Sequence, residues 1–222
     1  MSLPDLELQI WYARIAWGLV AASILLSVLP TLLPKVFPQL ARRTKAIVIA
    51  TVAVMMLLPG AASPAYWLTL VFQYPSGLLT GYSLVALAAR WRERPVIFSL
   101  NPVFALLLTL AGVALYLDAF GVLALEMYYR GFDSGAVALL SCAAAAVAAI
   151  AVFFRYAGAA GAALLTSVLL FSVLRLPTGN LWDAVLDPLL WAWAFASVIV
   201  AGMRIYAARK AARPQPVAAT SW

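Results

Sequence analysis

The chain has 222 residues, of which 66% are hydrophobic and 10% are charged, and its mean hydropathy is +0.99. This composition leaves too little polar surface to cover a soluble globule, so it indicates a protein that lies in lipid. The net charge of +7 does not favour nucleic-acid binding, because the basic residues are divided among short gaps between apolar stretches, as they are in membrane proteins.

Seven apolar segments follow one another along the chain, and each predicts a membrane-crossing helix. Helices are expected because backbone polar groups in lipid must be paired within the protein, and the runs are too continuous for the alternating strands of a β-barrel. The second segment is uninterrupted only from Ala46 to Leu58, so by itself it also fits a re-entrant segment. The segments span residues 10–33, 46–62, 65–89, 102–118, 135–154, 158–175 and 183–206.

The sorting of charge predicts the topology of these segments. Basic residues gather after the first, third, fifth and seventh segments, whereas all the acids except Glu93 lie elsewhere. The clusters at 35–45 and 90–94 should share one side, so the second segment must be a full crossing. Seven crossings then place the N-terminus outside and the C-terminus in the cytoplasm, with only Arg14, Arg130 and Arg175 of the 15 basic residues outside. We expect a multi-pass protein of the cell inner membrane.

We expect a single transmembrane helical bundle over residues 1–213 and a disordered cytoplasmic tail over residues 214–222. Two stretches of the sequence resemble each other, and this internal echo predicts that helices one to three and five to seven form a parallel repeat joined by helix four, a 3+1+3 arrangement. In this echo Leu58-Pro59-Gly60, Tyr66-Trp67 and Tyr74-Pro75 correspond to Leu176-Pro177-Thr178-Gly179, Trp182 and Asp187-Pro188.

The layout with the N-terminus outside, together with Pro38-Gln39 near the inner end of the first helix, resembles the SWEET and PQ-loop transporters. A second Pro-Gln dipeptide is expected in these families at the inner end of the fifth helix, where this chain has Arg155-Tyr156. No substrate and no site residue is therefore taken from the resemblance.

Several residue types that catalysis and cofactor binding need are absent. The chain has no histidine, which excludes histidine-ligated haem b, a histidine-containing zinc or copper site and a Ser-His-Asp triad. Its lysines lie in loops or the tail, which excludes a retinal Schiff base within the helices, and no P-loop or dinucleotide fingerprint occurs. The lone Cys142 cannot form an intrachain disulfide. We expect no cofactor and no metal, which disfavours an enzyme.

Six polar residues near the outer ends of the third and seventh segments are the candidates for ligand binding. On one continuous helix the two aspartates would share a face, where they could bind a cation or share a proton. The aspartate before Pro188 also fits a helix N-cap. The polar interruption of the third segment fits either a broken helix with a substrate site or a packed proline kink. The six candidates are Gln73, Tyr74, Arg175, Asn180, Asp183 and Asp187.

Two further patterns concern packing and the outer surface. Asp118, Glu126 and Arg130 fall on one side of a helical wheel, which predicts an amphipathic helix that is either solvated or a docking surface. The run from Ala143 to Ala146 and the Gly158/Ala162 pair predict close packing between the fifth and sixth helices.

Three functions fit this sequence. The leading interpretation is a transporter or channel for a small solute or ion, with an outward-facing polar pocket formed by the six candidates. The second is a non-catalytic accessory or assembly subunit of a larger membrane complex, with a membrane protein partner or a second copy of itself. The third is an intramembrane enzyme that uses the carboxylates as acids on a lipid or an isoprenoid.

Overall fold

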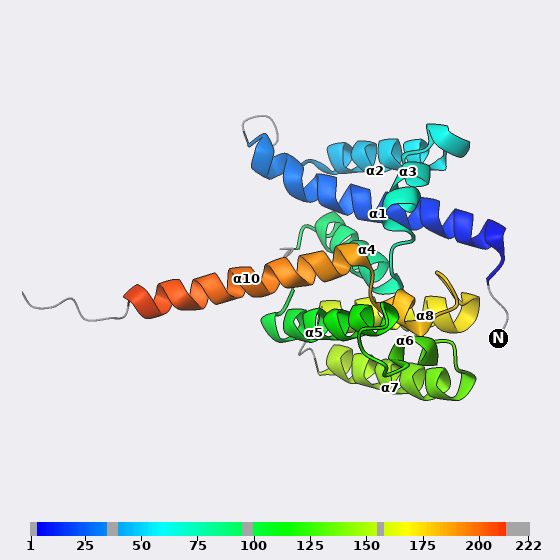
Figure 1. Cartoon of the computed structure of the whole chain (residues 1–222). Coiled ribbons are helices and arrows are strands. Elements are labelled where there is room, and N and C mark those ends of the chain that lie inside the picture. Colours follow the sequence, from blue (N-terminus) through cyan, green and yellow to red (C-terminus); the bar gives the residue numbers. More distant parts are fainter. Residues whose placement is uncertain (1–3, 35–39, 95–99, 155–157, 212–222) are drawn as a thin grey trace, which may run out of the picture.

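A computed structural model describes residues 4–34, 40–94, 100–154 and 158–211. All regular structure in these ranges is helical, and each of the seven apolar segments falls on helices (Figure 1). Lys35, Pro38-Gln39, Arg155-Tyr156, Arg213 and the predicted tail lie outside the described residues. The elements are α1 (Leu6–Leu32), α2 (Arg42–Leu57), the 3₁₀ turn η1 (Gly60–Ala62), α3 (Pro64–Phe72), α4 (Gly77–Trp91), α5 (Pro102–Ala119), α6 (Met127–Arg130), α7 (Ser134–Phe153), α8 (Gly158–Leu174), α9 (Leu181–Val185) and α10 (Pro188–Ala211).

Four helices in the described chain are long and apolar enough to cross a membrane, namely α1, α5, α7 and α10. A bilayer core of about 30 Å needs about 20 helical residues, and α8 is apolar but has only 17. The most apolar windows of α7 and α10 are only 17% and 11% buried inside the protein. Lipid must cover so much exposed apolar surface, which makes this chain a membrane protein.

Polar residues set the starts of most helices. Each accepts a hydrogen bond from an amide of the first turn, and three precede a proline, whose missing amide hydrogen would be unpaired there in any case. The capping residues are Asp5, Ser63, Ser76, Asn101, Asp133, Asn180 and Asp187. The predicted N-cap role of the last one is confirmed by a 2.8 Å bond from the Leu190 amide to its Oδ1.

The third apolar segment is a broken helix. α3 ends where Gln73 takes a left-handed φ of 61°, and α4 begins only at Gly77. The intervening turn is held from α1, because the Tyr12 hydroxyl donates a 2.7 Å hydrogen bond to the Pro75 carbonyl. Of the two alternatives for this segment, the break is found and the continuous kinked helix is not.

The amphipathic surface helix predicted over residues 118–130 is wrong. α5 ends at Ala119, a loop follows, and only the single turn of α6 is helical. The Asp118 carboxylate is buried and accepts bonds from the amides of Leu125 (2.9 Å) and Tyr128 (2.8 Å). The Asp118 side chain bonds to amides of the loop that follows it, and these bonds take the place of helical ones. Positions on a helical wheel therefore do not apply to this segment.

Small residues bring α4 and α8 into backbone contact. A Cβ atom on Gly81 would lie 2.6 Å from the Ala163 carbonyl oxygen, and one on Gly77 would lie 2.9 Å from the Ser167 Cα. α8 also contacts α7 closely at Gly161, opposite the Ala148 carbonyl. The sequence predicted a close contact at the Gly158/Ala162 pair, but the pair does not make one, since a Cβ atom on Gly158 would meet nothing within 4 Å.

The basic clusters after the first and third segments meet at one end of the molecule. Lys45 donates a 2.9 Å hydrogen bond to the Arg90 carbonyl. The Arg90 guanidinium in turn donates to the Leu26 carbonyl at 2.9 Å, an acceptor that is free because Pro30, four residues on in α1, has no amide hydrogen. Arg42 and Glu93 form the ion pair found among the described residues, with N and O 3.1 Å apart.

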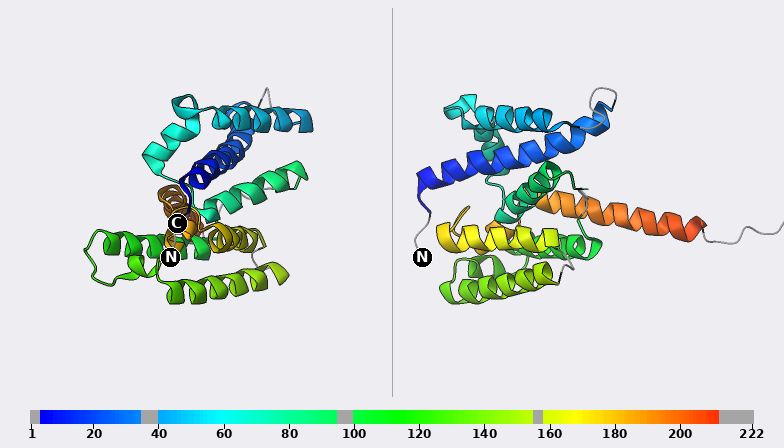
Figure 2. Two further views of the ribbon diagram at one scale, coloured as in Figure 1. Left: turned by 90° about the vertical axis from the view of Figure 1, so that its right-hand side faces the viewer. Right: turned by 180° about the vertical axis from the view of Figure 1, so that it is seen from behind.

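The helices fall into two groups on either side of α4. α1, α2 and α3 lie together at the top of Figure 1, and α5, α7 and α8 lie together at the bottom. α10 starts beside α5 and then projects beyond the ends of its neighbours, as Figure 2 shows from behind. The candidate site lies where α3, α5 and α10 come together.

Candidate functional site

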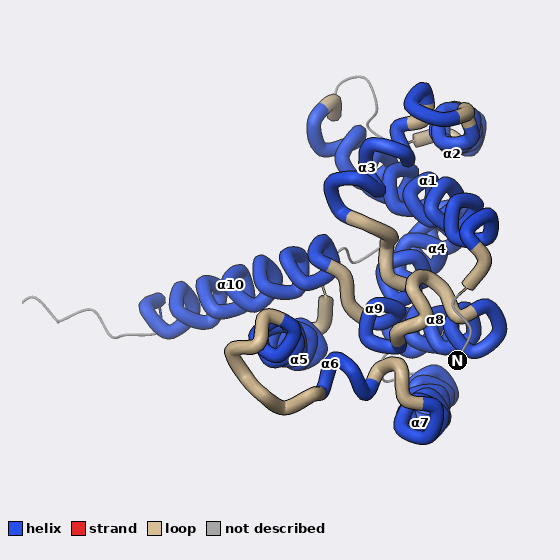
Figure 3. The backbone as a smooth tube through the Cα atoms, turned by 45° about the vertical axis from the view of Figure 1, so that its right-hand side comes forward, coloured by secondary structure: helices blue, strands red, loops and turns tan. Residues whose placement is uncertain are grey.

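The Asp187 carboxylate connects the two helix interruptions of the chain. Its Oδ1 caps α10, and its Oδ2 accepts a 2.8 Å hydrogen bond from the Ser76 amide in the turn between α3 and α4. Only 5% of this residue is exposed, so losing either bond would be costly. Figure 3 shows the non-helical turn after α3 passing beside the junction of α9 and α10.

Asp183 lies in the short helix α9, outside the four candidate spans. Its Oδ2 accepts a 2.5 Å hydrogen bond from the Thr178 hydroxyl, whereas Oδ1 has only a 3.3 Å contact from the Tyr128 hydroxyl. Burial raises the pKa of this carboxyl, and the two hydroxyl donors partly oppose that change. Burial, with the charge of Asp183 nearby, raises the pKa of Tyr128 to about 12.

The sequence suggested that the two aspartates share a face of one continuous helix, but the helix is interrupted between them. α9 ends at Val185, and Leu186 is extended, with φ −136° and ψ 129°. Both carboxylates nevertheless face one cavity, because the chain turns between them.

This cavity has a volume of about 270 Å³ and lies between the end of α3, the end of α5 and the α9–α10 junction. Its lining combines two carboxylates, five aromatic rings and small or aliphatic groups. The lining residues are Val71, Phe72, Gln73, Tyr74, Leu115, Tyr116, Ala119, Tyr128, Pro177, Thr178, Trp182, Asp183, Leu186, Asp187 and Pro188.

Four of the six sequence candidates therefore line one cavity: Gln73, Tyr74, Asp183 and Asp187. Arg175 does not line it, and its guanidinium lies 5.1 Å from the centre of the Phe171 ring. Asn180 is fully buried and caps α9 while its amide donates to the Tyr128 carbonyl at 3.2 Å. It positions α9 against α6, and it does not line the cavity.

Sequence reasoning missed the aromatic side of the cavity. Tyr116, Tyr128 and Trp182 lie near helix ends, where single aromatic residues are common in membrane proteins, so the sequence alone does not mark them as lining residues. Their signal was proximity to acids in sequence, since each lies within two residues of an acidic residue. The ring of Trp182 is fixed by a 2.8 Å bond from its Nε1 to the Met127 carbonyl.

The described residues contain no group of three or more metal-binding side chains. The side chains that line the cavity offer carboxylates, phenols, a hydroxyl, an amide and aromatic ring faces. Comparison of the chain with protein-family models, with curated proteins and with solved structures finds no match.

Proposed function

We propose that this protein is a seven-helix transporter or channel of the cell inner membrane that binds a small solute or ion in the cavity between α3, α5 and α10. The observation that carries the proposal is the placement of this cavity at two interrupted helices. Broken helices leave polar backbone and side chains at a packed helix interface, which is how many transporters form a binding site.

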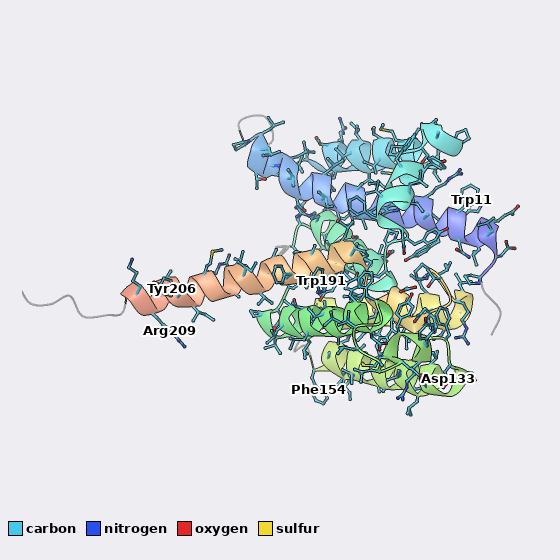
Figure 4. All side chains as sticks on the ribbon, in the orientation of Figure 1. Trp11, Asp133, Phe154, Trp191, Tyr206 and Arg209 are labelled. Atoms are coloured by element: carbon cyan, nitrogen blue, oxygen red, sulfur yellow. The ribbon has the colours of Figure 1, made fainter. Side chains whose placement is uncertain are left out.

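The topology in the proposal has the N-terminus outside and the C-terminus in the cytoplasm. The meeting of the basic clusters at 42–45 and 90–94 supports an even number of crossings between them. In Figure 4, Trp11 and Asp133 lie at one end of the bundle, while Tyr206 and Arg209 lie at the far end of α10. This separation agrees with acids on the outer side and basic residues on the inner side.

The 3+1+3 repeat is part of the same proposal. The echo in the sequence falls on two similar interruptions, one between α3 and α4 and one between α9 and α10. Each interruption is followed by a helix whose first turn is capped by a polar side chain, Ser76 in α4 and Asp187 in α10. In this arrangement the repeats meet at the cavity, where the Asp187–Ser76 bond joins them.

Mass spectrometry of the gently extracted protein tests the proposal. A tryptophan at Ala119, which lines the cavity, should displace a bound solute, whereas one at Ala111, which lies in the same helix but does not line the cavity, should not. We expect a small molecule to co-purify at about one per chain with the wild type and with Ala111→Trp, and to be lost from Ala119→Trp. Absence of any small molecule from the wild type would contradict the proposal.

A non-catalytic accessory subunit is the second candidate function, and the position of α10 favours it. α10 projects beyond its neighbours (Figure 2), and its side chains at Phe195, Met203 and Ile205 are about half exposed. A helix of a larger complex could lie along this surface in place of lipid. In the same experiment, a stoichiometric protein partner without a bound small molecule would favour this function.

A further inference from the structure

The lining of the cavity is acidic and aromatic. It contains the carboxylates of Asp183 and Asp187 and the rings of Phe72, Tyr74, Tyr116, Tyr128 and Trp182. No lysine or arginine is found among the described residues that line it. The local charge therefore favours a positive ligand, and the ring faces favour one with an apolar surface.

We propose that the cavity binds a small organic cation, of the alkylammonium class, with its charged group between Asp183 and the aromatic rings. This inference rests on the proposed function and specifies its substrate class. Aromatic rings arranged around a carboxylate are the usual environment for ammonium groups that carry carbon substituents, because such groups bind ring faces and lose little hydration.

Asp183 is the ionic partner in this proposal. Asp187 already accepts amide hydrogen bonds on both oxygens, from Ser76 and from Leu190. Asp183 has a short bond on Oδ2 only, so its Oδ1 keeps acceptor capacity for a ligand. The 3.3 Å contact from the Tyr128 hydroxyl is long for an O–H···O bond and is easily exchanged for a ligand contact.

The other ligand classes fit the cavity less well. A bare metal cation needs several oxygen ligands at once, whereas one of the two carboxylates is already engaged on both oxygens. An anion would be repelled by both carboxylates. The volume of about 270 Å³ lies just below the range of about 300–1,000 Å³ typical of small-molecule pockets, so it suits a small metabolite and not a drug-sized molecule.

Three isosteric probes test the charge preference. Choline, its uncharged analogue 3,3-dimethyl-1-butanol and the anion 3,3-dimethylbutanoate have similar shape and differ in charge. We expect isothermal titration calorimetry on the purified protein in lipid nanodiscs to show that choline binds about tenfold or more tightly than the neutral analogue. Equal or tighter binding of either analogue would overturn the cation inference and leave the solute-binding function standing. If none of the three probes binds, the inference fails, while the co-purification experiment still decides the function.

Single substitutions then test which side chains of the cavity bind choline. Asp183→Asn should weaken choline binding about tenfold and change the binding of the neutral analogue little, because the negative charge is removed while the size of the side chain is kept. Asp133→Asn is the control, since this exposed cap of α7 lies outside the cavity. Tyr116→Leu should weaken choline binding, whereas Tyr116→Phe, which keeps the ring, should not. Unchanged choline affinity in both Asp183→Asn and Tyr116→Leu would contradict the proposed site.

Discussion

At the scale of single residues, Asp187 carries two structural roles with one carboxylate. It starts α10, and it holds the turn before α4, which lies 111 positions away in the chain. The cap follows from the local sequence Asp187-Pro188, and the sequence predicted it. The bond to Ser76 depends on two distant segments meeting, so no local pattern announces it. Asp183 has one oxygen that is less engaged, which is why the proposed cation site uses Asp183.

Replacing the Asp187 carboxylate should lower the free energy of unfolding more than replacing an ordinary helix cap does. Asp133→Ala removes an exposed cap of α7 and should lower the free energy of unfolding by about 1 kcal/mol. Asp187→Ala also leaves the buried Ser76 amide without its partner and should lower it by about 2–4 kcal/mol. Chemical unfolding of both variants in mild detergent measures the difference. Equal losses would show that the bond between the two interruptions contributes nothing.

At the scale of elements, close helix contacts are made by single glycines and not by every small residue in a run. The α4–α8 contact uses Gly77 and Gly81 against Ser167 and Ala163. The sequence showed that the helices were rich in small residues, but the Gly158/Ala162 pair that it singled out is not the contact. Which face of a nearly uniformly apolar helix meets its neighbour depends on packing, because hydropathy does not distinguish the faces.

Adding a methyl group at Gly81 or at Gly158 tests which of the two glycines makes a close helix contact. Gly81→Ala places its Cβ against the Ala163 backbone, which cannot move without shifting α8, so we expect a loss of about 1–3 kcal/mol in unfolding free energy. Gly158→Ala meets open space and should change stability by no more than about 0.5 kcal/mol. Thermal unfolding of the two variants in the same detergent compares them. A larger loss at Gly158 would contradict the packing of α4 on α8.

At the scale of the whole molecule, charge and hydropathy act together. Four helices have the length and composition of membrane spans, and basic residues of the first two clusters lie in contact at one end. The proposed topology extends this to seven crossings, with α2, the α3–α4 pair and α8 as the shorter ones. Shorter apolar helices can cross where the bilayer thins or where neighbours cover their ends.

Cysteine labelling tests that topology directly. In a Cys142→Ala background, Ala124→Cys lies in the α5–α6 loop and Ala41→Cys lies at the start of α2, both at exposed positions. A membrane-impermeant maleimide should label Ala124→Cys in spheroplasts and Ala41→Cys only after the membrane is opened. The reverse pattern would invert the orientation, and labelling of both from one side would rule out an odd number of crossings between them.

The sequence by itself determined that this chain is helical and lies in a membrane, and that polar groups interrupt the third segment. These properties depend on composition and on neighbours within a few residues, so they can be read locally. Only the tertiary structure decided that Gln73, Tyr74, Asp183 and Asp187 line one cavity, that Arg175 and Asn180 do not, and that aromatic rings complete it. Those facts depend on how side chains from distant segments approach one another, which the packing of the whole chain sets.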